Sequence, residues 1–149
     1  MLEAWELTRS ATQKAAIDRS LGILTQRLIR QVPLPDGAQA ALLVDVGNEV
    51  KLGGNAVCLL ALVKYTELTG DRQYMTLMEQ LALGIRAMQD TKSGRFVHVL
   101  NFPKLDIKDA FRVIYYDGEA AFGLMRLYGL TRDERWLALV EKAFDHFIA

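Results

Sequence analysis

The segment Thr69-Gly70-Asp71-Arg72-Gln73-Tyr74 is matched further along the chain by Thr131-Arg132-Asp133-Glu134-Arg135-Trp136. The same spacing relates flanking residues: Leu62 with Leu124, Leu68 with Leu130, Met75 with Leu137, and Glu79 with Glu141. In each copy an apolar stretch precedes a Thr-x-Asp turn, and an amphipathic stretch follows it. The repeat predicts two helical hairpins, at about residues 53–91 and 117–149, each with a buried inner helix and a half-exposed outer helix.

The inner helices are predicted from their lack of charge. Residues 56–63 are apolar on every face, and Asn55 before them is the expected N-cap of a helix that runs to about Thr69. The second inner helix covers Glu119 to Leu130, where only Glu119 and Arg126 are charged. A helix that is apolar all round is expected to be buried.

The outer helices each carry one apolar stripe, with Asp71 and Asp133 as the expected N-caps. Residues at helical spacing lie on one face, so each outer helix is expected to cover the inner helices and expose its other face. The stripes are Tyr74, Met78, Leu81, Ile85 and Met88, and then Trp136, Leu137, Val140, Ala143, Phe144, Phe147 and Ile148.

A further helix is predicted from Ser10 to Val32. Ser10 and Gln13 match the S-x-x-Q capping box, and Pro33 stops the helix. Its apolar face is formed by Ile17, Leu21, Leu24 and Leu28.

Short strands are predicted between the helices, where β-branched and aromatic residues gather between turn residues. They are Ala40 to Val46, Glu49 to Leu52, Arg95 to Leu100 and Phe111 to Tyr116, with a turn at Gly47-Asn48 and a break at Gly53-Gly54. The order of inner helix, turn, outer helix and β-containing loop favours an α/α toroid over a TPR-like solenoid, whose repeat is shorter and lacks strands. We therefore expect one all-α domain over residues 1–149, an incomplete (α/α) toroid with short β-hairpins.

Composition argues against several function classes. Of 149 residues 51% are apolar, and 18 basic and 18 acidic residues give zero formal net charge. This balance argues against a nucleic-acid partner and against a polybasic membrane patch. The longest apolar run, residues 56–63, is too short to span a bilayer, and the N-terminal segment lacks the pattern of a signal peptide. With Cys58 as the single cysteine no intrachain disulfide is possible, and we expect a cytoplasmic protein.

Four segments resemble the helical hairpins of six-hairpin glycosidase-like (α/α) toroids. They are Lys51-Leu-Gly-Gly-Asn55-Ala, Tyr65-Thr-Glu-Leu-Thr-Gly-Asp71, Tyr115-Tyr116-Asp117-Gly118-Glu119-Ala120 and Leu127-Tyr128-Gly-Leu-Thr-Arg-Asp133-Glu-Arg-Trp136. The chain most resembles the C-terminal domain of D-glucuronyl C5-epimerases and related uncharacterised bacterial domains. These often carry Tyr-Tyr-Pro-Gly-Glu-Ala where this chain has Asp117 instead of proline. The resemblance covers roughly Lys51 to Ala149, and it implies a carbohydrate-acting or carbohydrate-binding domain, with uronic-acid glycans favoured.

The length conflicts with a complete ring of this kind. Six hairpins need twelve helices, and the sequence predicts about five. The chain is therefore expected to be either a reduced toroid or a part of one whose N-terminal half is missing. Both arrangements leave apolar flanks uncovered, which favours a partner, so we expect a homo-oligomer or association with the missing half.

The start of the second inner helix is the strongest candidate site. Tyr115, Tyr116 and Glu119 are the candidate catalytic residues, because C5 epimerisation of a uronic acid needs proton removal on one face and return on the other. Glycoside hydrolysis needs two carboxylates that flank the bond, and Asp117 and Glu119 are too close in a helix to point the same way. The structural alternative is that Asp117 caps the helix and Glu119 interacts with its dipole.

The candidate substrate-binding residues are Asn55, His98, Arg112 and Asp117. Arg112 can hold a uronate carboxylate through two hydrogen bonds, or pair with Asp106 or Asp109 instead. His98 and His146 lie too far apart for a metal-ligand pattern, so we expect no metal and no cofactor. An enzyme with this site would be a glycan epimerase or a glycoside hydrolase or lyase. The alternative is a non-catalytic structural or protein-interaction domain, or a fragment, of a larger protein.

Overall fold

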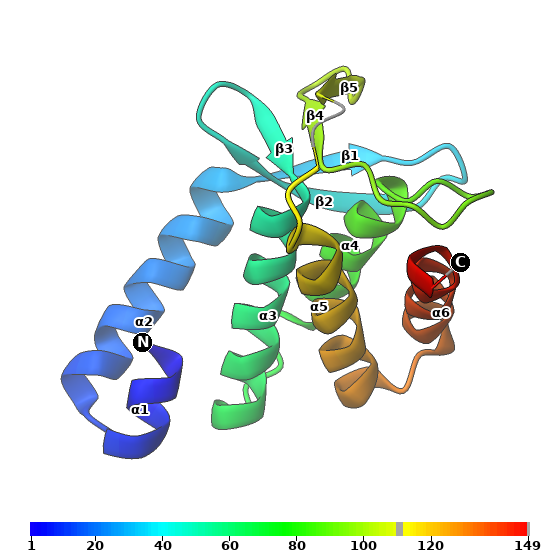
Figure 1. Ribbon diagram of the computed structural model, residues 1–149. Coiled ribbons are helices and arrows are strands. Elements are labelled where there is room, and N and C mark those ends of the chain that lie inside the picture. Colours follow the sequence, from blue (N-terminus) through cyan, green and yellow to red (C-terminus); the bar gives the residue numbers. More distant parts are fainter. Residues whose placement is uncertain (110–111, 149) are drawn as a thin grey trace.

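The computed structural model describes residues 1–109 and 112–148, which are mostly helical (Figure 1). The helices are α1 (Leu2–Thr8), α2 (Ala11–Ile23), α3 (Leu52–Thr69), α4 (Met75–Ala87), α5 (Tyr116–Thr131) and α6 (Glu134–Ile148), with a π-helical segment, Leu24–Leu28, after α2. The strands are β1 (Ile29–Pro33), β2 (Gln39–Asp45), β3 (Glu49–Lys51), β4 (Val99–Asn101) and β5 (Ile107–Asp109). The prediction of a helical chain with small β elements is confirmed in outline.

The strands form one antiparallel sheet in the order β1-β2-β3-β4-β5, which is larger than the separate hairpins expected. The pair β3–β4 brings Val50 opposite Leu100, so it joins the residues before α3 to those before α5. Figure 1 shows the sheet at the end of the molecule where α3 and α5 begin. The sheet therefore positions the N-terminal ends of these two helices.

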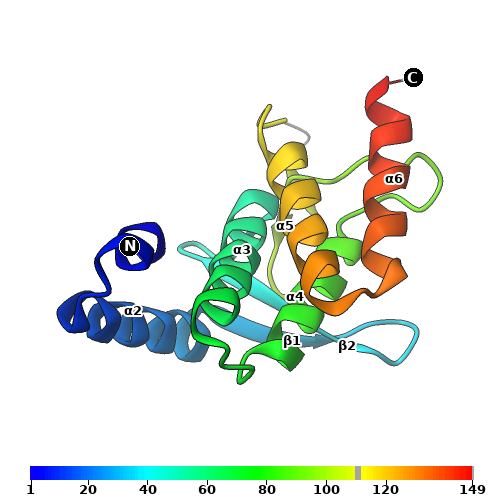
Figure 2. The same cartoon turned by 90° about the horizontal axis from the view of Figure 1, so that it is seen from below.

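The two inner helices, α3 and α5, lie side by side, with α1 and α2 on one side and α6 on the other (Figures 1 and 2). Leu59 and Leu62 of α3 and Leu124 of α5 are fully buried, as predicted for inner helices. The outer helix α6 buries Trp136, and α4 packs on β2. No helix in residues 1–109 or 112–148 combines the length and hydropathy needed to cross a membrane.

The predicted repeat extends to individual hydrogen bonds. Thr69 Oγ1 donates to the Tyr65 carbonyl and accepts from the Asp71 N–H. The same two bonds recur at the matching position of the second hairpin, where Thr131 Oγ1 donates to the Leu127 carbonyl and accepts from the Asp133 N–H. The threonine hydroxyl thus ends each inner helix and starts the turn to its outer partner.

A third copy of this turn lies at Thr8-Arg9-Ser10, where none was predicted. Thr8 Oγ1 accepts from the Ser10 N–H, and Arg9 has a φ of 52°, close to the 72° of Gly70 and the 57° of Arg132. In all three turns the N–H of this middle residue donates to the carbonyl four positions earlier at 2.8 Å. The sequence signal was the tripeptide Glu6-Leu7-Thr8, which recurs as Glu67-Leu68-Thr69. Helix α1 is therefore a short inner helix, and α2 is its outer partner.

Successive inner helices are joined by equivalent ion pairs. Glu6 Oε2 of α1 lies 2.6 Å from Lys64 Nζ of α3, and Glu67 of α3 pairs with Arg126 of α5. The spacing between the two glutamates and the spacing between the two cations differ by a single position, so the pairs occupy matching places in the repeat. The next position in the glutamate series, on α5, is Gly129.

The helix predicted from Ser10 to Val32 is wrong in its second half. Ser10 Oγ accepts from the Gln13 N–H at 3.5 Å and caps α2 as expected, but α2 ends at Ile23. Residues 29–33 instead form β1, which pairs with β2 from Ile29↔Leu43 to Pro33↔Gln39. The helical spacing of the apolar residues continues to Leu28, and pairing with β2 across a short turn decides the conformation beyond it.

Two predicted helix starts are also wrong. Helix α3 begins at Leu52 with Lys51 as its N-cap, so Asn55 is not the N-cap and Gly53-Gly54 lies inside the first turn. The cause is that β3 runs directly into α3. Helix α4 begins at Met75, so Asp71 instead closes the preceding turn by accepting from the Gln73 N–H. Asp133, directly before α6, accepts from the Arg135 N–H as a capping residue does.

The first two predicted strands are present as β2 and β3, with boundaries shifted by one position. Of the third prediction, Arg95 to Leu100, only the end lies in a strand, β4, and Phe96 forms a single bridge with Gln89. Of the fourth, Phe111 lies outside the described residues, residues 112–115 form no strand, and Tyr116 begins α5. Strand β4 pairs with β3 on one side and with β5 on the other. β5 lies before the predicted fourth strand in the chain.

Cys58 lies in the core, and its thiol should be unreactive in the folded protein. Burial raises the pKa of its thiol from 9.0 to about 12, and the thiolate is the reactive form. We expect a disulfide-exchange reagent at pH 8 to label Cys58 only after denaturant is added. Rapid stoichiometric labelling of the folded chain would show that α3 opens readily.

Candidate functional site

The buried side chain of His98 connects three segments at the N-terminal end of α5. Its backbone carbonyl accepts from the Leu52 N–H at the start of α3, and its Nδ1 accepts from the Val113 N–H at 2.9 Å. A ring nitrogen that accepts a hydrogen bond carries no proton, so the His98 proton lies on Nε2. This Nε2 lies 3.1 Å from Asp117 Oδ1, but the two atoms are not aligned as a hydrogen bond, so their contact is mainly electrostatic.

Asp117 is the acidic centre of this group. It lies in the first turn of α5 and its side chain is only 10% exposed. One carboxylate oxygen faces His98, and the other accepts from the Arg112 guanidinium. Arg112, for which the sequence offered Asp106 or Asp109 as partners, is therefore paired with Asp117. The N-terminus of α5 adds a favourable dipole for the negative charge.

The Tyr116 ring packs between two aromatic neighbours. Its centroid lies 5.6 Å from that of His98 and 5.5 Å from that of Tyr115, which is largely exposed. Burial raises the pKa of the Tyr116 phenol, and the nearby charge of Lys51 partly opposes this effect. Near neutral pH the Tyr116 hydroxyl therefore retains its proton and can donate a hydrogen bond.

Glu119 is half-buried, and its carboxylate lies over Gly53 on α3. A β-carbon at Gly53 would lie 2.3 Å from Tyr116 Cε1 and 2.7 Å from Glu119 Oε2, so only glycine leaves room for both side chains. The sequence pattern indicated only the end of a strand at this glycine, and its packing role was missed. The contact also turns Glu119 toward α3, whereas Asp117 faces His98, so the two carboxylates point apart as expected.

Asn55 lies outside this group of contacts. Its side chain accepts from the Leu43 N–H at 2.8 Å and donates to the Lys51 carbonyl at 2.9 Å, and the residue is fully buried. These bonds tie α3 to β2. The structure thus gathers six of the seven predicted site residues at one end of α5: Tyr115, Tyr116, Glu119, His98, Arg112 and Asp117.

An open cleft of about 510 Å³ adjoins the group, between the start of α5 and the end of α6. Its lining combines the Arg112–Asp117 pair with aromatic and apolar side chains: Ile114, Gly118, Phe144, His146 and Phe147. The Phe144 and Phe147 rings lie 5.5 Å apart, nearly perpendicular. The sequence placed both phenylalanines in the apolar stripe of the last helix, so their part in a cleft was missed.

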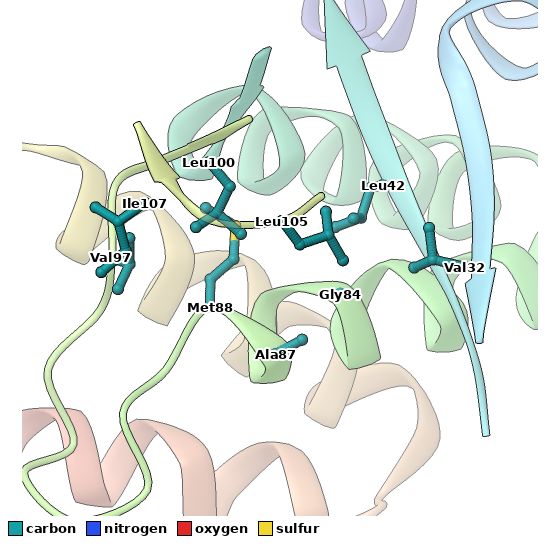
Figure 3. Close-up of a pocket in the computed structure, with 9 residues that line it drawn as sticks. All are labelled: Val32, Leu42, Gly84, Ala87, Met88, Val97, Leu100, Leu105 and Ile107. Atoms are coloured by element: carbon teal, nitrogen blue, oxygen red, sulfur yellow. The ribbon is translucent and has the colours of Figure 1, made fainter. Parts of the chain in front are cut away.

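A second cavity, of about 190 Å³, lies between the sheet and the C-terminal end of α4 (Figure 3). All nine lining residues are apolar or glycine: Val32, Leu42, Gly84, Ala87, Met88, Val97, Leu100, Leu105 and Ile107. A cavity without polar side chains has few groups to orient a sugar, so the cleft beside α5 is the better candidate. Among residues 1–109 and 112–148, no group of three or more His, Cys, Asp or Glu side chains is placed to hold a metal ion.

The group at the end of α5 offers three kinds of polar contact to a ligand. The Tyr116 phenol can donate a hydrogen bond, the Glu119 carboxylate can accept one or take a proton, and Arg112 has N–H groups beyond those that bind Asp117. His98 and Asp117 are buried behind Arg112 and hold it in place. Such a set can bind hydroxyl and carboxylate groups beside an aromatic surface.

No family model matches the chain, and no curated protein matches it by sequence. The fold is similar to several solved structures. Cellobiose 2-epimerase from Bacillus thermoamylovorans B4167 superposes with a TM-score of 0.74 at 18% identity, over 97% of this chain and 37% of that one. The GH76A α-1,6-mannanase of Salegentibacter sp. HEL1_6 has a TM-score of 0.79 at 16% identity, over 99% and 44%. A sugar epimerase from a ruminal bacterium has a TM-score of 0.72 at 16% identity, over 97% and 37%.

All three are (α/α)-toroid folds, as the repeat predicted. The chain spans less than half the length of each of these proteins. At these identities the likeness concerns the fold, and it does not extend to a shared reaction. The protein has the fold of part of an (α/α) toroid.

Proposed function

We propose that this chain is a carbohydrate-acting part of an (α/α) toroid, and that the group at the N-terminal end of α5 contacts the sugar. Tyr115, Tyr116 and Glu119 are the proposed catalytic contacts, and Arg112 is the proposed carboxylate-binding residue. The observation that carries the proposal is the gathering of a phenol, a carboxylate and a guanidinium at the N-terminal end of α5, where Arg112 and Asp117 line an open cleft. The fold of sugar epimerases and a mannanase supports it.

A uronic-acid unit is the proposed ligand. Its carboxylate would meet the N–H groups of Arg112 that do not bind Asp117, and its apolar ring face would lie on the Phe144–Phe147 pair. Epimerisation at C5 removes a proton from one face of the ring and returns one to the other. Glu119 is the proposed proton acceptor and the protonated Tyr116 the proposed donor. His98 and Asp117 are positioning residues that hold Arg112.

Titration calorimetry with uronic-acid oligosaccharides tests this assignment, with a mannotriose as the neutral comparison. We expect binding of the acidic oligosaccharide, and Arg112→Ala should weaken it about tenfold, or about 1.4 kcal/mol. Glu119→Gln keeps the shape of the side chain and should abolish any proton exchange at C5 in D₂O. Glu141→Gln, on an exposed position of α6, is the matched control.

Two results would contradict the proposal. One is the absence of binding to both the acidic and the neutral oligosaccharide at millimolar concentration. The other is binding that Arg112→Ala leaves unchanged. A non-catalytic interaction domain is the second candidate, and the exposed apolar side chains at the end of α5 and on α6 favour it: Ile114, Phe122, Phe144, Phe147 and Ile148.

A further inference from the structure

We propose that the edge formed by α5 and α6 binds the α1 end of a second copy of this chain, in the packing that joins α3 to α5. Two copies that make this contact at both edges would close a ring. The inference goes beyond the proposed carbohydrate function and does not depend on it. It rests on the repeat, which shows within one chain how an inner helix receives the next.

Helix α5 packs against α3 through a close contact around Gly123. A β-carbon at Gly123 would lie 3.4 Å from the Ala56 carbonyl oxygen, 3.5 Å from Leu59 and 3.8 Å from Leu60. The two helices are also joined by the ion pair of Glu67 with Arg126. The outer helices contribute as well, because the segment after α4 bonds to α6 through Thr91 and Gln89.

The equivalent face of α5 is present but uncovered. The spacing that relates Thr69 to Thr131 also relates Ala56 to Gly118, Leu60 to Phe122 and Glu67 to Gly129. Phe122 is 53% exposed, and β-carbons at Gly118 and Gly129 would meet nothing within 4 Å. Small and apolar residues thus form a surface similar to the α5-binding face of α3. Gly118, Phe122 and Gly129 are open on it, whereas Ala121, the equivalent of Leu59, is buried.

The part of this edge that α6 forms is also apolar. Phe144 and Ile148 are exposed on α6, and Ile114 before α5 is 92% exposed. Exposed apolar side chains gathered on one edge mark a surface that binds another protein. Arg112 and Asp117 lie in the cleft at this edge, so a second copy would wall the candidate sugar site.

The charges of the repeat select α1 as the helix that binds there. Each inner-helix contact in the described chain pairs a glutamate with a cation on the next helix, but α5 offers Gly129 at the glutamate position. The arriving helix should therefore carry no cation opposite it. On α1 the position equivalent to Lys64 is Glu3, whose side chain is 79% exposed. Its carboxylate lies 3.3 Å from Lys64 Nζ of its own chain, so Glu3 is paired as the cations of α3 and α5 are, but α1 carries no cation at this position.

The position of α1 favours a ring as the assembly that two copies form. Helices α1 and α6 lie at opposite ends of the row of helices (Figure 1), so a contact between them is head-to-tail. A head-to-tail contact produces a closed ring when the rotation between copies closes, and an open filament when it does not. One copy spans 37–44% of the toroid chains that it resembles, so two copies approach one ring.

Sedimentation equilibrium of the full chain over micromolar concentrations tests the contact, with circular dichroism of every variant to confirm folding. We expect a dimer of about twice the 16.7 kDa chain mass. Gly129→Glu places a carboxylate opposite Glu3 of the second copy, and a closed dimer contains this contact twice. It should raise the dissociation constant by roughly tenfold. Phe122→Lys should raise it by about 100-fold, because it buries a charge in the contact.

The decisive test is a double variant that introduces an ion pair between the two copies. Glu3→Lys gives up the contact of Glu3 with Lys64 in its own chain, so Glu3→Lys alone is the reference for that loss. Combined with Gly129→Glu it creates a glutamate–lysine pair between the copies, so the double variant should dimerise more tightly than Gly129→Glu alone. Arg72→Glu, in the exposed turn between α3 and α4, is the control and should leave the dimer unchanged. A monomer at all concentrations would overturn the proposal. So would a dimer that is insensitive to Phe122→Lys, or a double variant no tighter than Gly129→Glu.

Discussion

Replacing Gly84 by alanine should destabilise the folded chain by roughly 3 kcal/mol, at the upper end of the range for overpacking. A β-carbon at this position of α4 would lie 2.3 Å from the Ala41 carbonyl oxygen and 2.8 Å from Leu42 Cδ2. The carbonyl belongs to the middle of β2 and is held by strand pairing, so it cannot turn aside. Helix α4 would have to move away from the sheet and open the apolar cavity beside Gly84.

Urea unfolding of Gly84→Ala and Gly22→Ala measures this effect against a matched control. Gly22 lies in α2, and a β-carbon there meets nothing within 4 Å. Alanine at this site should stabilise the protein by about 0.5–1 kcal/mol through helix propensity. Equal effects of the two substitutions would show that α4 is not packed directly on β2.

Asp117→Ala should cost about 2–3 kcal/mol, because it leaves His98 and Arg112 without their acidic partner. His98 is almost fully buried and loses the charge that faces its Nε2. Arg112 is more than one-third exposed and can turn to water, which keeps the cost below that of a fully buried pair. The loss should loosen residues 112–115 and the start of α5 together.

Denaturant unfolding of Asp117→Ala and Asp117→Asn separates charge from shape. Asparagine retains an oxygen for Arg112, so its cost should be about half that of alanine. Glu141→Ala, at an exposed position of α6, is the control and should change stability by less than about 0.5 kcal/mol. A neutral effect of Asp117→Ala would mean that the three side chains do not form a structural unit.

The sequence predicted the inner and outer helices well because their signals are local. The fully apolar stretch around Leu59 and the stripe that contains Trp136 each encode burial within one helix. The prediction failed at residues 29–33, where strand pairing overrides the helical spacing. They become β1 because β2, which follows after a short turn, offers backbone partners. A helical period does not reveal this pairing.

The sequence named six of the residues that lie together at the start of α5, but it did not predict their contacts. Tyr116, Asp117 and Glu119 could be singled out because they begin an inner helix. That His98 and Arg112 would join Asp117 depends on the course of the chain from β4 to α5, which no local pattern encodes. The need for Gly53 beneath Tyr116 is likewise a property of two packed helices.

The three threonine-centred turns make the chain a row of interchangeable units of nearly equal length. Each unit supplies its own turn, and the contacts that hold it are with the units on either side. A duplicated copy of residues 70–131, inserted after Thr131, would therefore keep every turn bond and lengthen the row by one hairpin. Growth or loss of whole hairpins by gene duplication and deletion is thus open to this architecture, without redesign of any single helix.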